Sequence, residues 1–231
     1  MTGAESSVGE LPVRADARRN QRRLLDAAIQ LILEIGGEPP RDAVAQRAGV
    51  GIATLYRHFP DRQALLHAVV LDVLDRTIDR GHSALAESAT GGEALRRYMH
   101  AAIDNGLGVV NIVHALLDTA EWPDRRAGAQ DMLDQLIDIA RRDNAIDNDV
   151  TATDIALATI RFCRPLAIGL DPAHERAIAH RHLNSYLDGL AAQRDQSAQP
   201  TLRSPATIPI ARRSKSVTAM NPVGDTRYRR H

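Results

Sequence analysis

Apolar residues recur at helical spacing through most of the chain, and no stretch of apolar and polar alternation is long enough to build a sheet. The clearest early run follows the i, i+3, i+4 rule: Leu25, Ala28, Ile29, Ile32 and Ile35. Gly36 and Gly37 end the predicted helix. The pattern as a whole predicts an all-α fold.

Two short helices, joined at a glycine, are predicted between residues 41 and 59. A longer helix follows over 61–80, with Asp61 as its N-cap and with an apolar side. That side consists of Leu65, Leu66, Val69, Val70, Val73, Leu74 and Ile78. Residues 82–192 predict a second helical domain with five segments: 93–107, 109–120, 131–142, 151–168 and 173–192.

Residues 41–59 carry the pattern of a helix-turn-helix. Ala45 and Ala48 are small enough for two helices to approach closely, and Gly49 follows the first helix where a left-handed backbone is needed. Leu55 and Phe59 share the buried side of the second helix. Its outer side then presents Thr54, Tyr56, Arg57 and His58, side chains suited to phosphates and base edges. An ordinary helical hairpin with a polar outer face remains the alternative.

The motif Ala-Gly-Val, followed four residues later by Leu-Tyr-Arg-His-Phe, resembles the N-terminal domain of the TetR family of transcriptional regulators over residues 18–80. The resemblance implies that the helix over 50–58 enters the major groove and that a basic residue opening the next helix, here Arg62, reaches a phosphate. With the upstream arginines, the expected DNA-binding residues are Arg18, Arg19, Arg22, Gly51, Ile52, Ala53, Thr54, Tyr56, Arg57, His58 and Arg62.

The chain departs from the family pattern at the ends of these short helices. Gly51 replaces the usual serine cap, and Ile52 stands where a basic residue is common. Isoleucine cannot bind a phosphate but can pack on a thymine methyl. Arg41 stands where the family usually buries an aliphatic residue, and Pro39-Pro40 replaces a Thr or Ser cap. These departures leave the fold prediction intact and make the base preference unreadable.

The formal net charge is zero, which by itself argues against nucleic acid. The distribution of charge answers the objection, because residues 14–23 hold five arginines against one acid. Phosphates respond to charge within a Debye length of about 10 Å. Lys215 is the only lysine, and codon bias explains the arginine excess more simply than function does.

The sequence excludes several other classes of protein. Cys163 is the only cysteine, so no intramolecular disulfide or multi-cysteine metal site is expected, and we predict a buried thiol. Neither a signal peptide nor a membrane span is present, which predicts a cytoplasmic protein. Since catalytic and phosphate-binding motifs are missing, we expect no enzyme, no cofactor and no metal.

The last two predicted helices suggest an oligomer. Residues 151–168 are apolar on most sides, and a helix of that kind needs cover on most sides. A four-helix bundle formed with a second copy is the simplest cover, and the resemblance implies the same homodimer. The expected interface residues are Ile155, Thr159, Phe162, Ile178, Leu183, Tyr186 and Leu187. A fully buried helix within a monomer is the alternative.

Apolar and aromatic residues of the second domain predict a small-molecule site, although the same residues would also suit a core. The candidates are Met99, Ile103, Val113, His114, Leu117, Trp122, Leu136, Phe162 and Arg164, with Val110 and Met132 beside them. His114 and Arg164 stand out because each lies within an apolar run and needs a partner or a ligand.

These predictions combine into a modular regulator: a disordered segment 1–13, a DNA-binding domain 14–60 with a basic arm, a connecting helix 61–80, an effector and dimerisation domain 82–192, and a disordered basic tail 193–231. The predicted function is a ligand-responsive repressor bound to double-stranded DNA at a palindromic operator. Two alternatives stay open: a dimeric DNA-binding protein without an effector, and a helical partner-binding protein whose helix-turn-helix is incidental.

Overall fold

The computed structural model describes residues 10–117, 122–164 and 170–197. Within these ranges every regular element is an α-helix, as the apolar periodicity predicted. The helices are α1 (Glu10–Ile35), α2 (Arg41–Ala48), α3 (Ile52–His58), α4 (Arg62–Glu87), α5 (Gly91–Asp104), α6 (Gly108–His114), α7 (Pro123–Arg142), α8 (Ala152–Cys163) and α9 (Pro172–Ser197).

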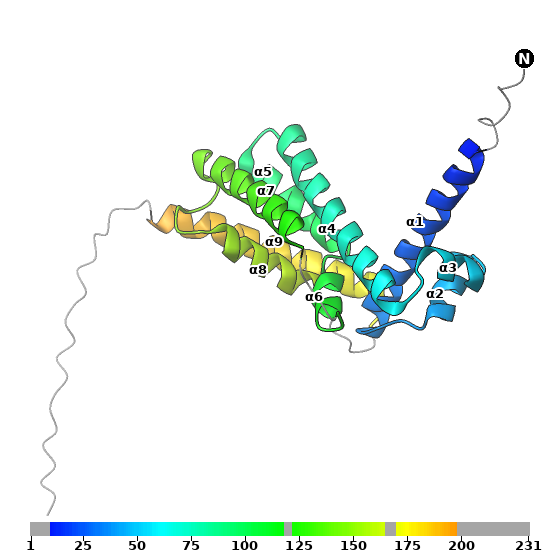
Figure 1. Ribbon diagram of the computed structural model, residues 1–231. Coiled ribbons are helices and arrows are strands. Elements are labelled where there is room, and N and C mark those ends of the chain that lie inside the picture. Colours follow the sequence, from blue (N-terminus) through cyan, green and yellow to red (C-terminus); the bar gives the residue numbers. More distant parts are fainter. Residues whose placement is uncertain (1–9, 118–121, 165–169, 198–231) are drawn as a thin grey trace, which may run out of the picture. The chain divides into compact units, whose positions relative to one another are not determined.

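Helices α1, α2 and α3 form an N-terminal head, and α4 leads from it into the bundle of α5 to α9 (Figure 1). The head closes over Leu24, Ile32, Val44 and Leu55, all essentially inaccessible to solvent. One continuous cluster of buried apolar side chains extends from the head through α4 to Leu190 in α9. The head is therefore anchored to the bundle by packing rather than by a loop.

Helix α4 runs seven residues past the predicted end at residue 80, to Glu87. The predicted boundary at residues 80–82 is wrong because Gly81 does not end the helix. A Cβ at Gly81 would lie 2.1 Å from the sulfur of Met132, so the glycine lets α7 approach α4 closely. Since α4 packs against both α1 and the helices of the bundle, it belongs to the two predicted domains at once.

Both ends of the folded region extend beyond the predictions. Helix α1 begins at Glu10, although residues 1–13 were predicted to be disordered. Pro12 falls in the first turn, where a missing N–H removes no intrahelical hydrogen bond. Helix α9 runs to Ser197, five residues into the segment predicted as a disordered tail from residue 193. The rest of that tail and residues 1–9 lie outside the described residues.

Helices α7 and α8 also differ from their predicted bounds. Helix α7 starts eight residues early, because Pro123 opens it at the position where proline is best tolerated. Helix α8 ends at Cys163 rather than at residue 168, since Arg164 precedes a proline and adopts an extended conformation, with ψ of 121°. Its start is fixed by a capping box between Thr151 and Asp154.

Candidate nucleic-acid interface and ligand cavity

The corner between α2 and α3 has the geometry that the sequence predicted. Gly49 adopts a left-handed conformation, with φ of 64°. Its N–H donates to the Gln46 carbonyl at 3.0 Å, and the Val50 N–H donates to the Ala45 carbonyl at 3.0 Å. This pair of bonds is a Schellman ending, which satisfies two carbonyls that α2 would otherwise leave open. Pro40 is itself the N-cap of α2, so Arg41 is the first helical residue.

Helix α3 separates a buried side from an outer side. Leu55 and Phe59 are buried, whereas Tyr56 is 49% exposed and Ile52 is 43% exposed. Gly51, Ala53 and Arg57 are exposed as well, and Thr54 and His58 are half-buried. The seven residues predicted on this element as DNA contacts thus share one short surface, with an apolar start and a polar end.

Arg57 is held along the outer side of α3. Its Nε donates to the Ala53 carbonyl at 3.3 Å and its Nη2 donates to the Thr54 hydroxyl at 3.1 Å. Both acceptors lie on the same helix, so the guanidinium stays close to the α3 surface. A phosphate is a stronger acceptor than a neutral hydroxyl or a carbonyl, so the guanidinium of Arg57 can exchange these two hydrogen bonds for bonds to a phosphate.

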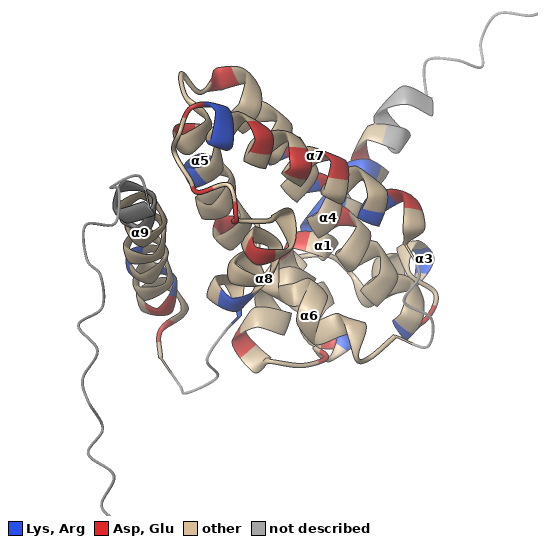
Figure 2. Ribbon diagram, turned by 90° about the vertical axis from the view of Figure 1, so that its left-hand side faces the viewer, with Lys and Arg blue, Asp and Glu red and all other residues tan. Residues whose placement is uncertain are grey.

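The other predicted arginines are less available than the sequence suggested. Arg22 pairs with Asp72 of α4 at 2.7 Å, Arg62 pairs with Glu38 at 2.7 Å, and Arg19 pairs with Asp16. Arg18 is exposed. Basic residues colour α1 and the neighbourhood of α3 in Figure 2, and acidic residues recur beside them and along α7. Several arginines must therefore leave an acid before they can reach a phosphate.

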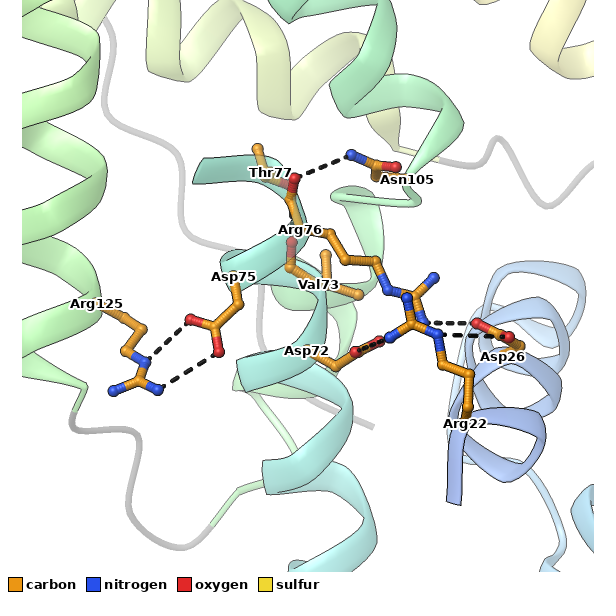
Figure 3. Close-up of polar contacts among 9 residues, drawn as sticks. All are labelled: Arg22, Asp26, Asp72, Val73, Asp75, Arg76, Thr77, Asn105 and Arg125. Carbon is orange, nitrogen blue, oxygen red and sulfur yellow. Dashed lines mark hydrogen bonds and ion pairs between the residues drawn. The ribbon is translucent and has the colours of Figure 1, made fainter. Parts of the chain in front are cut away.

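Arg22 belongs to an ion-pair network between α1 and α4 (Figure 3). Arg76 lies 2.5 Å from both Asp26 and Asp72, whose side chain is only 13% exposed. Burial alone would lower the pKa of Arg76, but the hydrogen bonds that its guanidinium donates to the two carboxylates raise the pKa above its ordinary value. Asn105, which caps α5, donates to the Arg76 carbonyl at 3.5 Å. The network ties the head to the start of the bundle.

Residues 72–78 of α4 have two sides with different neighbours. Asp72 and Arg76 contact α1, whereas Leu74, Thr77 and Ile78 line a cavity of about 280 Å³ within the bundle. The other walls come from α5 to α8 and the residue before α6: Tyr98, Leu107, Val110, Asn111, His114, Ala129, Met132, Leu133, Ala156 and Ile160. The surface of the cavity is almost entirely apolar, with a hydroxyl, a phenol, an amide and an imidazole as polar points.

Of the nine residues predicted to bind a ligand, only His114 lines this cavity. Val110 and Met132, which were predicted to lie beside those nine, line it as well. Met99, Val113 and Leu136 are fully buried and serve as core, the alternative that the sequence left open. Leu117 is half-buried against that core. The Trp122 ring lies 5.5 Å from the His67 ring and 6.3 Å from the His114 ring.

Ile103, Phe162 and Arg164 surround a different hollow, of about 260 Å³, between the end of α1, the end of α8 and the start of α9. These three residues therefore do not line the same cavity as His114, and binding of a ligand by them stays a prediction. Four cavity residues on α4 and α5, Leu74, Thr77, Ile78 and Tyr98, were missed. The periodicity placed Leu74 and Ile78 on one apolar side, but it could not distinguish a side that faces a neighbouring helix from one that faces a cavity.

Burial keeps two titratable groups of this region neutral. It raises the pKa of the Tyr98 phenol far above its ordinary value, so the phenol enters the cavity wall as a hydroxyl. Burial also raises the pKa of the Cys163 thiol to about 12, with Asp104 contributing in the same direction. Cys163 is therefore the buried thiol that the sequence predicted.

Four of the seven predicted dimer residues are buried inside the single chain: Ile155, Thr159, Leu183 and Leu187. Phe162 and Tyr186 are half-buried and pack on each other, with ring centroids 5.5 Å apart, and Ile178 is half-buried too. Within the subunit these four residues pack where the apolar sides of α8 and α9 face α5 and the rest of the bundle, and the subunit interface itself stays a prediction. The outer side of α8 presents Leu157, which is 51% exposed.

Known proteins share both the head and the whole bundle. A family model described as "Bacterial regulatory proteins, tetR family" matches residues 24–69, which span the end of α1 to the first half of α4. A TetR transcriptional regulator from Streptomyces coelicolor is 30% identical and superposes with a TM-score of 0.58, over 74% of this chain and 97% of that one. The chain belongs to the TetR family.

A second TetR structure, from Mycobacterium vanbaalenii, is 31% identical, with a TM-score of 0.58 over 78% of this chain and 99% of that chain. The repressor KstR of Rhodococcus jostii is 37% identical over 82 residues, 35% of this chain and 39% of KstR. The chain thus spans well under half the length of that curated relative. TetR proteins are transcriptional regulators, so this chain is a regulator and not an enzyme.

The residues that match the family model include the whole of α2 and α3, the two helices predicted as the helix-turn-helix. No helix in the part of the chain that the structure describes has the length and apolar character needed to cross a bilayer.

Proposed function

We propose that this TetR regulator is a homodimeric repressor that places one α3 helix from each subunit in the major groove of a palindromic operator. The observation that carries the proposal is the outer side of α3, where Tyr56 and Ile52 are exposed on the second helix of a helix-turn-helix. The name of KstR as a repressor supports repression. Binding to chromosomal DNA places the regulator in the cytoplasm.

In this proposal, different residues of α3 contact the DNA backbone and the base edges. Tyr56, Thr54 and His58 contact phosphates and sugars, which sets the register of the helix on the duplex. Ile52 and Ala53 at the exposed start of α3 meet base edges, where a thymine methyl suits the isoleucine. Arg57, Arg18 and Arg62 supply charge-assisted contacts to the backbone once Glu38 releases Arg62.

The cavity supports a ligand that is mostly apolar and carries one or two hydrogen-bonding groups. Its aliphatic walls favour burial of hydrocarbon, while Thr77, Tyr98, Asn111 and His114 offer polar partners. A ligand there touches Leu74, Thr77 and Ile78, one turn of α4, whose opposite side pairs with α1 through Asp72 and Arg76. A small rotation of α4 would shift both heads and change their separation.

DNA binding is tested with the full chain and sheared genomic DNA, by sequencing the retained fragments. Substitution Arg57→Ala is expected to weaken binding to the enriched fragment and to lower the slope of log K against log salt by about one. Arg181→Ala is the matched control, because Arg181 is an exposed arginine on α9, away from the head. Failure of the wild-type chain to retain any fragment, even at low salt, would refute the proposal.

The effector role is tested by filling the cavity. Ala156→Leu places a larger side chain in the cavity wall, whereas Ala127→Leu adds the same atoms at an exposed position of α7. The filled variant is expected to bind the operator fragment normally and to lose its thermal stabilisation by hydrophobic small molecules that stabilise the wild type. Release of both variants from DNA by the same ligand at the same concentration would place the effector elsewhere.

A further inference from the structure

Arg41 makes three contacts within the head. Its guanidinium carbon lies 4.1 Å from the centroid of the Tyr56 ring. Its Nη1 donates to the Pro60 carbonyl at 3.3 Å, and its Nη2 donates to the Phe59 carbonyl. Arg41 opens α2, while its partners lie on the outer side of α3 and just past its end. A half-buried arginine thus connects the start of one helix to the end of the next.

The chemistry of the guanidinium fits this position. It is flat, so its face can cover an aromatic ring while its N–H groups donate within the plane. The carbonyls at the end of a helix have no partner within the helix, and a cation is favoured there by the helix dipole. An aliphatic residue at position 41 could bury surface against α3 but could make neither kind of contact.

The contacts restrict Tyr56, which is otherwise half exposed on the surface proposed to meet DNA. A free tyrosine in water samples several rotamers, and ordering it costs part of the binding free energy. Stacking on Arg41 removes that freedom before DNA arrives. The two carbonyl bonds also hold the end of α3 in place relative to α2, so the ring and the helix that carries it are fixed together.

We infer that Arg41 is a positioning residue of the DNA interface: it holds Tyr56 and the end of α3 in the conformation that binds DNA, and does not itself bind phosphate. The Arg41 side chain is half-buried, its Nε is buried, Tyr56 covers one face of the guanidinium, and its two terminal nitrogens donate to carbonyls of the chain. By contrast, Arg57 lies exposed along α3. This inference rests on the proposed DNA-binding function.

The test is a double-substitution cycle on the full chain. Arg41→Met, Tyr56→Leu and the double variant are compared for binding to the genomic fragment that the wild type enriches, over a series of salt concentrations that begins low enough for every variant to bind. Arg41→Lys serves as the conservative variant, because lysine keeps the charge and lacks the flat fork. Thermal unfolding of each variant checks that the head is folded.

The expected result is a loss of about three- to tenfold in affinity for Arg41→Met, the size of a cation–π contact together with a lost helix-end contact. The salt slope should not change, Arg41→Lys should not restore the affinity, and Arg41→Met should have little further effect beside Tyr56→Leu. A salt slope lowered by about one with full rescue by lysine would make Arg41 a phosphate contact and overturn the inference. An equal loss with and without Tyr56 would overturn it as well.

A measurement without DNA separates this inference from the proposed function. Side-chain protons of Arg41 above the Tyr56 ring are expected to resonate upfield in the wild type and to return to ordinary positions in Tyr56→Leu. If the wild-type chain binds no DNA but the upfield shift is present, the proposed function fails and the contact stands. If the shift is absent, the positioning role fails whatever the chain binds.

Discussion

At the scale of single residues, Cys163 illustrates how position sets chemistry. The thiol is buried at the end of α8, and its pKa is raised to about 12 by burial. The thiolate is the reactive form, so the folded protein holds an inert cysteine at neutral pH. Burial therefore disfavours thiolate chemistry at the single cysteine in the folded state.

We expect a thiol reagent to leave folded Cys163 unmodified at pH 8 and to modify it fully after unfolding in guanidinium chloride. The sign of the pH effect follows from the raised pKa. Above about pH 9 the unfolded chain loses the thiol proton that the folded chain keeps, so the stability falls with rising pH. Colorimetric counting of thiols tests the labelling, and rapid modification of the folded protein would contradict the burial.

At the scale of the elements, helix α4 joins the two halves of the regulator. Asp72 and Asp75 lie on the same helix and each pairs with an arginine, yet their surroundings differ (Figure 3). Asp72 forms ion pairs with Arg22 and Arg76 between α1 and α4, and its side chain is largely buried. Asp75 pairs with Arg125 at an exposed surface, where water and salt screen the attraction.

Asp72→Asn is expected to destabilise the protein by about 1–3 kcal/mol, because it leaves two arginines with one carboxylate at a partly buried site. It should also loosen the head and weaken DNA binding. Asp75→Asn, the matched control, should change the unfolding midpoint little. Chemical denaturation of both variants checks the difference. Equal effects of the two substitutions would mean that the α1–α4 network does not anchor the head.

Close approach between helices α6 and α8 depends on Gly108. A Cβ at this position would lie 2.0 Å from the Cys163 carbonyl oxygen, so the two backbones must separate to accept it. Gly108→Ala should cost about 1–3 kcal/mol, the cost of overpacking, and lower the melting temperature by several degrees.

Gly189 of α9 provides the control, because a Cβ there meets nothing within 4 Å. Gly189→Ala should raise the stability by about 0.5–1 kcal/mol through helix propensity alone. Calorimetry distinguishes the two opposite signs. A neutral Gly108→Ala would show that α6 and α8 can move apart without cost.

At the scale of the whole molecule, the proposed dimer must use surfaces that one chain leaves uncovered. The apolar sides of α8 and α9 are occupied within the subunit, so the sides left over are more polar than the sequence suggested. Leu157 on the outer side of α8 is the large apolar residue best placed for such a contact. Two heads held in this way have to match half-sites about 34–36 Å apart.

Leu157→Asp is expected to raise the dimer dissociation constant at least tenfold (about 1.4 kcal/mol or more), because it would bury an unpaired charge in the interface. DNA affinity should fall with it. Ile35→Asp, at an equally exposed residue of α1, should leave the dimer intact. Sedimentation at micromolar concentration tests both. A wild-type chain that sediments as a monomer would contradict the dimer.

Local pattern was enough for the head. The apolar period, the small residues before Gly49 and the outward side of α3 all follow from interactions within a few residues, and the structure has each of them. The family followed from the same short motif. The ends of the helices were harder to predict. A glycine can end a helix or let another helix approach it, as Gly81 does, and a proline can end a helix or begin one, as Pro123 does.

The sequence by itself determined the helical class, the helix-turn-helix and its outward residues, because near neighbours along the chain set these features. Only the tertiary structure decided which apolar sides face a cavity, a core or the solvent, since that depends on helices distant in sequence. The tertiary structure also showed that Arg41, a departure from the expected pattern, contacts Tyr56. The two residues lie on different helices, so the spacing of apolar residues could not predict this contact.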